Sequence, residues 1–146
     1  MTESAKLTRA LNEALAATGE NQVIAALANL SVDREERFEL TIIANSGIHT
    51  IPERFIHGEK YVASKGSLDL ASREATETTY VRALKSLAAK LNERPWKKVY
   101  LIPTGPATLA MQIKLLVYHV TRLATVDLFY ADGDYFELDL HYRTYL

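Results

Sequence analysis

Two short loops carry residue types suited to binding an anion. The first is Pro103-Thr104-Gly105-Pro106, which directly precedes an apolar helical segment. A glycine there lets a ligand approach the backbone, and the unpaired N–H groups that open a helix attract negative charge. We therefore expect a phosphate-binding turn made by Thr104, Gly105, Pro106, Ala107 and Thr108. An alternative needs no ligand, because Pro106 suits the start of a helix and Thr104 suits a helix cap.

The second loop is Asn45-Ser46-Gly47, which ends a strand-like segment. These residue types tolerate left-handed backbone geometry, so Asn45, Ser46 and Gly47 can offer a hydroxyl and a nest of N–H groups to a phosphate. The same three residues also make an ordinary turn. Lys60 and Lys65 follow in a basic stretch, where they suit either a lid over a phosphate-rich ligand or a solvated loop.

Several other chemistries are not indicated by the sequence. There is no cysteine, and the P-loop, GxGxxG, HExxH and GxSxG patterns are absent. His49 and His57 lie in one loop with Glu53 and Glu59 nearby, but their spacing does not enforce the convergence that a metal requires. We therefore expect no metal and no cofactor.

Charge and length limit the partners. The net charge of the 146-residue chain is −1, so no overall field favours duplex nucleic acid or an anionic membrane. The N-terminus lacks a signal-peptide pattern and no apolar run approaches a membrane span. We expect a soluble, cytoplasmic protein with a single α/β domain over residues 1–146.

The elements that must position these loops follow from periodicity and turn signals. Helical spacing indicates helices at residues 4–17, 23–30, 76–92 and 107–122, of which the first two are N-terminal helices within residues 1–30. Strands are indicated at 38–44, 98–102, 125–131 and 135–145, with a hairpin at Asp132-Gly133 and a long ligand-side loop over residues 45–73. This order predicts a Rossmann-like, mostly parallel sheet with helices on both faces and a C-terminal antiparallel hairpin.

In such a sheet, ligands bind beyond the carboxyl ends of the strands, which places both loops at the floor of one site. The segments 99–111 and 126–133, Val-Tyr-Leu-Ile-Pro-Thr-Gly-Pro-Ala-Thr-Leu-Ala-Met and Val-Asp-Leu-Phe-Tyr-Ala-Asp-Gly, resemble the CARF and SAVED superfamily of cyclic-oligonucleotide sensors. The resemblance covers the last third to half of the chain. Thr104 and Gly105 match the family's Thr-Gly-Gly-Thr-Lys-like loop, whereas Pro106, Ala107 and Thr108 replace its second glycine, second threonine and lysine.

The resemblance implies a CARF-like homodimer that encloses a cyclic oligonucleotide, such as a cyclic oligoadenylate, between two copies of both loops. It places the chain in prokaryotic antiviral signalling of the CRISPR or CBASS type, with an effector protein encoded separately. Some relatives also cut the ring without a metal and leave a 2′,3′-cyclic phosphate, a role in which Ser46, Thr108 and a loop lysine would take part. The resemblance leaves open whether this chain cuts its ligand or only senses it.

Two alternatives to cyclic-oligonucleotide binding remain at this level. In the first, the chain is a non-enzymatic interaction module whose N-terminal helix docks a partner through Leu7, Leu11 and Leu15. In the second, it is an enzyme of another class that uses the histidine-bearing loop. No paired acid and base stand at an informative spacing to support the second.

Overall fold

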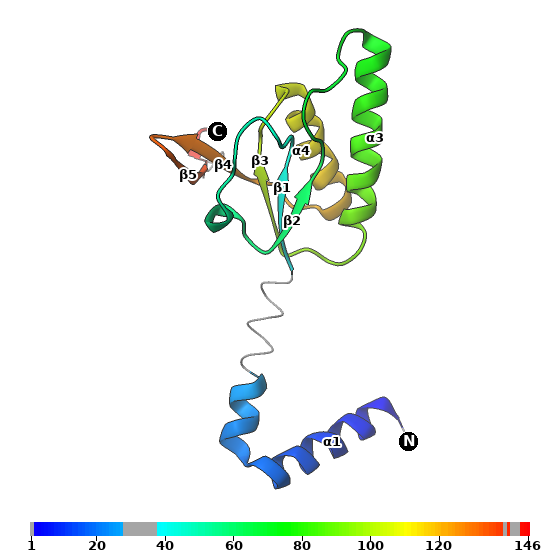
Figure 1. Ribbon diagram of the computed structural model, residues 1–146. Helices are drawn as coiled ribbons and strands as arrows, with labels where there is room; N and C mark the ends of the chain where they lie inside the picture. Colours follow the sequence, from blue (N-terminus) through cyan, green and yellow to red (C-terminus); the bar gives the residue numbers. More distant parts are fainter. Residues whose placement is uncertain (1, 28–37, 139, 141–143) are drawn as a thin grey trace. The chain divides into compact units, whose positions relative to one another are not determined.

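The computed structural model describes residues 2–27, 38–138, 140 and 144–146 (Figure 1). Contacts divide the chain into two compact units, Met1–Glu35 and Glu36–Leu146, and each is described by itself. Parts of two predicted elements, residues 28–30 of the second helix and residues 139 and 141–143 of the last strand, lie outside the described residues.

The second unit is built on a five-stranded mixed sheet. Its strands are β1 (Glu39–Ile43), β2 (Glu59–Val62), β3 (Lys98–Ile102), β4 (Val126–Ala131) and β5 (Asp134–Leu138), in the spatial order β2-β1-β3-β4-β5. The first four are parallel, and β5 returns antiparallel to β4 through the Asp132-Gly133 turn. The predicted α/β class, the mostly parallel sheet and the terminal hairpin are confirmed, and the described part of β5 ends earlier than predicted.

Helices α3 (Arg73–Leu91) and α4 (Ala107–Thr121) cover one face of the sheet. Both crossovers move the chain the same way across the sheet, which puts both helices on the same side. Leu87 of α3 and Ile113 of α4 join Leu40, Ile42 and Leu101 in one buried cluster.

The start of α3 differs from the prediction. Thr76 was expected to open this helix, but α3 begins one turn earlier, where the Ser72 hydroxyl accepts a hydrogen bond from the Ala75 N–H at 3.1 Å. Serine is as good a cap as threonine, and the turn before Thr76 contributes no apolar residue larger than Ala75 to the periodic pattern. The helix ends at Leu91 with Asn92 as its C-cap, within one residue of the predicted end.

The connection from β1 to β2 covers the opposite face of the sheet. It contains the single 3-10 turn η1 (Glu53–Phe55), and its Ile51 and Ile56 pack on Ile43, Ile102 and Leu128. The prediction of helices on both faces is therefore met only in part: two long helices cover one side, and a loop with the one helical turn of η1 covers the other.

Strand β2 corrects the prediction that residues 45–73 form one long loop. It pairs in parallel with β1, in register from Leu40–Glu59 to Ile43–Val62. Four residues are too few to show periodicity, so pairing with β1 decides their conformation. Gly58 permits this approach, because its φ is 65° and a Cβ there would lie 2.2 Å from the Glu39 carbonyl oxygen.

The first unit contains the predicted helix α1 (Glu3–Thr18) followed by helical residues 20–27. Thr2 caps α1, and Gly19, with φ of 86°, ends it at the predicted stop. No residue of α1 is buried, and Leu7 and Leu11 expose 72% and 41% of their surface. Among the described residues, no helix is both long and apolar enough to cross a membrane.

Candidate functional site

Asn45 joins the loops that follow β1, β2 and β3. Its N–H donates to the Thr104 hydroxyl at 3.1 Å, and that hydroxyl in turn donates to the Asn45 carbonyl. The Asn45 side-chain amide donates to the Gly66 carbonyl at 3.0 Å. Asn45 is only 3% exposed, so the predicted loop residues Asn45 and Thr104 form a buried junction at the carboxyl edge of the sheet.

These bonds correct one interpretation of the turn before α4. Thr104 does not cap the helix, because its hydroxyl is committed to Asn45, and the cap position is held by Pro106 without any side-chain hydrogen bond. Within the described chain, the N–H groups of Ala107 and Thr108 have no hydrogen-bond partner. The positive end of α4 is thus open to solvent, since both residues are exposed.

Gly105 fits against the junction and requires glycine. Its φ is 81°, and a Cβ there would lie 2.6 Å from the Cβ of Asn45. Behind it, the side-chain carbonyl oxygen of Asn45 is buried and has no partner among the described residues. An unpaired buried acceptor lowers the stability of the fold by about 1–3 kcal/mol. The other contacts of this turn therefore have to outweigh that cost.

Ser46, Gly47 and Lys65 lie beside the same junction. Ser46 and Lys65 form an isolated parallel bridge, in which the Ser46 N–H donates to Ser64 and the Gly66 N–H donates to Ser46 at 2.7 Å. Gly47 has φ of 100° and lies against Gly66. The exposed side chain of Lys65 places a positive charge at the carboxyl edge of the sheet.

Two other predicted site residues have partners of their own. Lys60 lies within β2 opposite Thr41, and its ammonium donates to the Glu53 carboxylate at 2.8 Å. The Thr108 hydroxyl is hydrogen-bonded to the Tyr80 hydroxyl of α3 at 2.6 Å. The described contacts do not bring Lys60 into the junction, nor do they join Ser46 to Thr108.

A cavity of about 560 Å³ opens next to Thr104 and Gly105. Its size is within the range of small-molecule sites. Ten residues from the ends of β3 and β4, from β5 and from the loop after β1 line it: His49, Thr50, Ile102, Pro103, Thr104, Gly105, Leu128, Phe129, Tyr130 and Tyr135. None of them is Asp, Glu, Lys or Arg, so the cavity suits an uncharged, planar group.

The tyrosines of the hairpin were missed as site residues. Tyr130 and Tyr135 are directly paired across β4 and β5, with ring centroids 5.1 Å apart. Burial, with a smaller effect of nearby Tyr130, raises the pKa of Tyr135 above its ordinary value of 10.0. The signal in the sequence was a tyrosine on each side of a tight Ala-Asp-Gly-Asp turn, at the end of a parallel strand.

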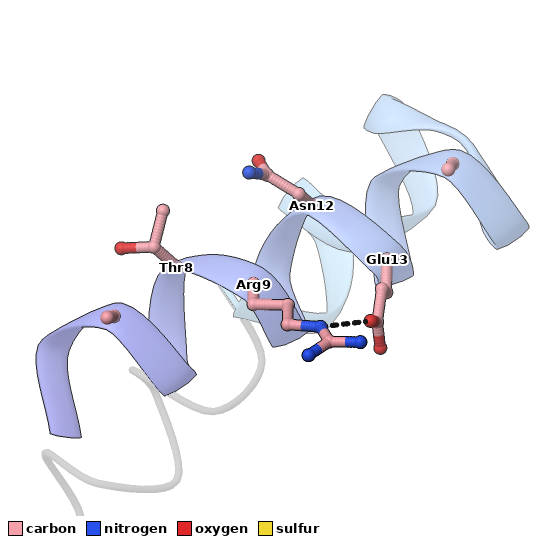
Figure 2. A pocket seen from close by; sticks show the side chains of 6 residues that line it. Thr8, Arg9, Asn12 and Glu13 are labelled. Atoms are coloured by element: carbon pink, nitrogen blue, oxygen red, sulfur yellow. Dashed lines mark hydrogen bonds and ion pairs between the residues drawn. The ribbon is translucent and has the colours of Figure 1, made fainter. Parts of the chain in front are cut away.

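A second hollow lies on α1 (Figure 2). All of its lining residues belong to that one helix, and the Arg9 guanidinium donates to the Glu13 carboxylate across it at 3.0 Å. One helix surface cannot surround a ligand. The cavity at the sheet edge is therefore the better candidate.

The described residues contain no group of three His, Asp or Glu side chains that could hold a metal. His57 instead stacks on Tyr100, with ring centroids 4.2 Å apart, while the exposed His49 lines the cavity. In the comparisons with known proteins, no family model, curated protein or solved structure matches the chain.

Proposed function

We propose that the carboxyl edge of the sheet binds a cyclic oligonucleotide second messenger, of the cyclic oligoadenylate kind, in prokaryotic antiviral signalling. The observation that carries the proposal is that Thr104 and Gly105 belong both to the uncharged, aromatic cavity and to the turn before the open N-terminus of α4. Backbone N–H groups suit a phosphate and aromatic rings suit a base. A nucleotide carries both groups.

In this proposal the phosphate is bound by backbone N–H groups rather than by charged side chains. Thr108 stands where the resembling family has lysine, and Lys65, which is bridged to Ser46, is an exposed cation beside the junction. The N–H groups keep their positions when the ligand leaves, because Asn45 holds the turn in place. We therefore propose ligand sensing as the main role, with slow ring cleavage by Ser46 and Thr108 as a secondary one.

A cyclic ligand repeats its nucleotide, and a twofold pair of chains repeats the site. We propose a homodimer in which each chain presents its Asn45 and Thr104 loops to one ring, and a separately encoded effector that reads the bound state. Two copies of the open α4 terminus then face two phosphates of the ring, which doubles the contacts without a new motif.

A thermal-shift screen with cyclic tri-, tetra- and hexa-adenylate tests the proposal. Ligand at 100 times its dissociation constant adds about 2.7 kcal/mol to the free energy of unfolding, which raises the melting temperature by several degrees. If none of the three rings shifts the transition, the proposal is abandoned. Chromatography of the ring after incubation with wild type and Ser46→Ala then separates cleavage from sensing, because a sensor returns the ring intact.

A second candidate function is favoured by α1. Its Leu7 and Leu11 are exposed on a helix that buries no residue of its own, which is the pattern of a helix that docks in an apolar groove of a partner. We propose an effector protein as that partner. Leu11→Asp should abolish co-purification of an identified effector without changing the melting of the sheet unit, and unchanged co-purification would exclude this role for the leucines.

A further inference from the structure

We infer that the cavity beside Thr104 is a nucleobase subsite in which the base stacks on the tyrosines of the β4–β5 hairpin. This inference rests on the proposed function and specifies it further: the turn before α4 takes the phosphate, and the hairpin takes the base. The first support is the lining, which has aromatic rings on the hairpin side and no charged side chain. A phosphate is too costly to bury there, and a neutral aromatic base is not.

The hairpin holds the two tyrosines differently. Tyr135 is fixed on its inner side by Phe55, with ring centroids 5.1 Å apart, and Arg54 lies over the Phe55 ring at 4.6 Å. The Arg54 guanidinium is also 4.0 Å from the Asp134 carboxylate. Tyr135 therefore packs against η1, which belongs to the connection between β1 and β2. This contact makes Tyr135 a rigid side of the subsite.

Tyr130 is the exposed member of the pair. It lies at the end of β4, directly opposite Tyr135, and exposes 58% of its surface. A side chain that exposes an aromatic ring at the mouth of a cavity offers a face on which a base can stack. Stacking of a base on an aromatic ring is worth about 1–3 kcal/mol, so one tyrosine changes affinity by about fivefold to a hundredfold.

The polar groups of the lining suit the edge of a base. The Thr50 hydroxyl is exposed at the cavity, and Thr104 and Gly105 bring backbone groups to its floor. Hydroxyls and backbone groups both donate and accept, so they can pair with an amino group or a ring nitrogen. Purines present the larger stacking face, and we expect the subsite to prefer adenosine 5′-monophosphate to uridine 5′-monophosphate.

Titration of the ¹⁵N-labelled full chain with adenosine 5′-monophosphate and with ribose 5-phosphate tests the inference. The two probes share the phosphate and differ in the base. We expect the first to bind at least tenfold more tightly and to shift amides of residues 128–135 as well as residues 104–108. Ribose 5-phosphate should shift only residues 104–108.

Paired tyrosine variants locate the effect. Tyr130→Leu should remove the tenfold advantage of adenosine 5′-monophosphate and leave ribose 5-phosphate binding as it was. Tyr118→Leu is the matched control, because Tyr118 is similarly exposed, at 54%, but lies on α4 outside the cavity lining. Both tyrosines are exposed, so neither variant should impair folding.

The outcomes distinguish failure of base binding from failure of phosphate binding. Equal affinity for both probes, with shifts confined to residues 104–108, would overturn the base subsite and leave the phosphate turn standing. Loss of the advantage in Tyr118→Leu but not in Tyr130→Leu would also overturn it. No shift with either probe at millimolar concentration would overturn the subsite and count against the proposed function as well.

Discussion

The hydroxyl of Thr104 exchanges two hydrogen bonds with the backbone of Asn45, accepting from its N–H and donating to its carbonyl. The backbone ladder between β1 and β3 continues to the bond from the Ala44 N–H to the Ile102 carbonyl, and the Thr104 side chain supplies the next two bonds. These two bonds tie the loops after the two strands together, so we expect a ligand that contacts the Thr104 turn to act on the Asn45 loop as well.

Thr104→Val keeps the shape of the side chain and removes both bonds. The N–H and carbonyl of buried Asn45 lose their partner, so we expect the free energy of unfolding to fall by about 1–3 kcal/mol. Urea titration followed by circular dichroism measures it. Thr78→Val, at an exposed position of α3, is the control and should stay within about 0.5 kcal/mol of wild type. Equal losses in the two variants would show that the Asn45 bonds contribute nothing.

Gly105→Ala tests the fit between the turn and Asn45. The new Cβ meets the Asn45 side chain at 2.6 Å and also has to adopt φ near 81°. Gly133→Ala shares only the second problem, because its φ is 80° and nothing lies within 4 Å of its Cβ position. The left-handed backbone alone costs about 1–3 kcal/mol.

We therefore expect Gly133→Ala to lower the free energy of unfolding by that amount and Gly105→Ala to lower it further. Gly105→Ala should also weaken binding of the ligand, since it displaces the turn, whereas Gly133→Ala should weaken it less. If both alanine variants unfold at the same urea concentration, the contact between Gly105 and Asn45 is not a tight one.

Stability should decline in alkaline solution. Burial lowers the pKa of Lys90, but hydrogen bonds and charge attraction from Glu59 and Glu93 outweigh this and raise it above 10.5. Burial also raises the pKa of Tyr61 above 10.0. Both groups hold their protons more firmly in the folded chain, so their contribution is complete below pH 10 and disappears as the pH rises through the folded pKa values.

Lys90→Met isolates the lysine part of that decline. The ammonium lies between the carboxylates of Glu59 and Glu93, 2.9 Å from the latter, with only 13% of the side chain exposed. We expect a loss of about 1–3 kcal/mol at pH 7 and a smaller further loss between pH 9 and 11. Lys85→Met, at an exposed site on α3, is the control. An alkaline decline in Lys90→Met as steep as in wild type would contradict the assignment.

Several elements of the fold could be predicted because their evidence is local. The unit from Lys98 to Thr121 combines an apolar strand, a Pro-Gly turn and a long apolar helix, and the structure matches its predicted boundaries to within one residue. The Asp132-Gly133 hairpin carries its turn type in its own residues. In both places the short-range signal and the long-range packing agree.

The features that could not be predicted depend on distant partners. Strand β2 exists because its four residues pair with β1, and the role of Thr104 is set by Asn45, 59 residues earlier. The same distance effect concealed the cavity, which is closed by tyrosines from the hairpin against a loop that follows β1. The spacing of residues within one segment does not indicate which distant residues will pair.

Native mass spectrometry of the full chain with an equimolar mixture of cyclic tri-, tetra- and hexa-adenylate tests the central claim most directly. One spectrum gives the mass of each complex, and from that mass the number of chains and the size of the bound ring. We predict a species of two chains that retains one ring of a single size, and loss of that species in Gly105→Ala. A spectrum in which neither the monomer nor any dimer retains a ring would contradict the account.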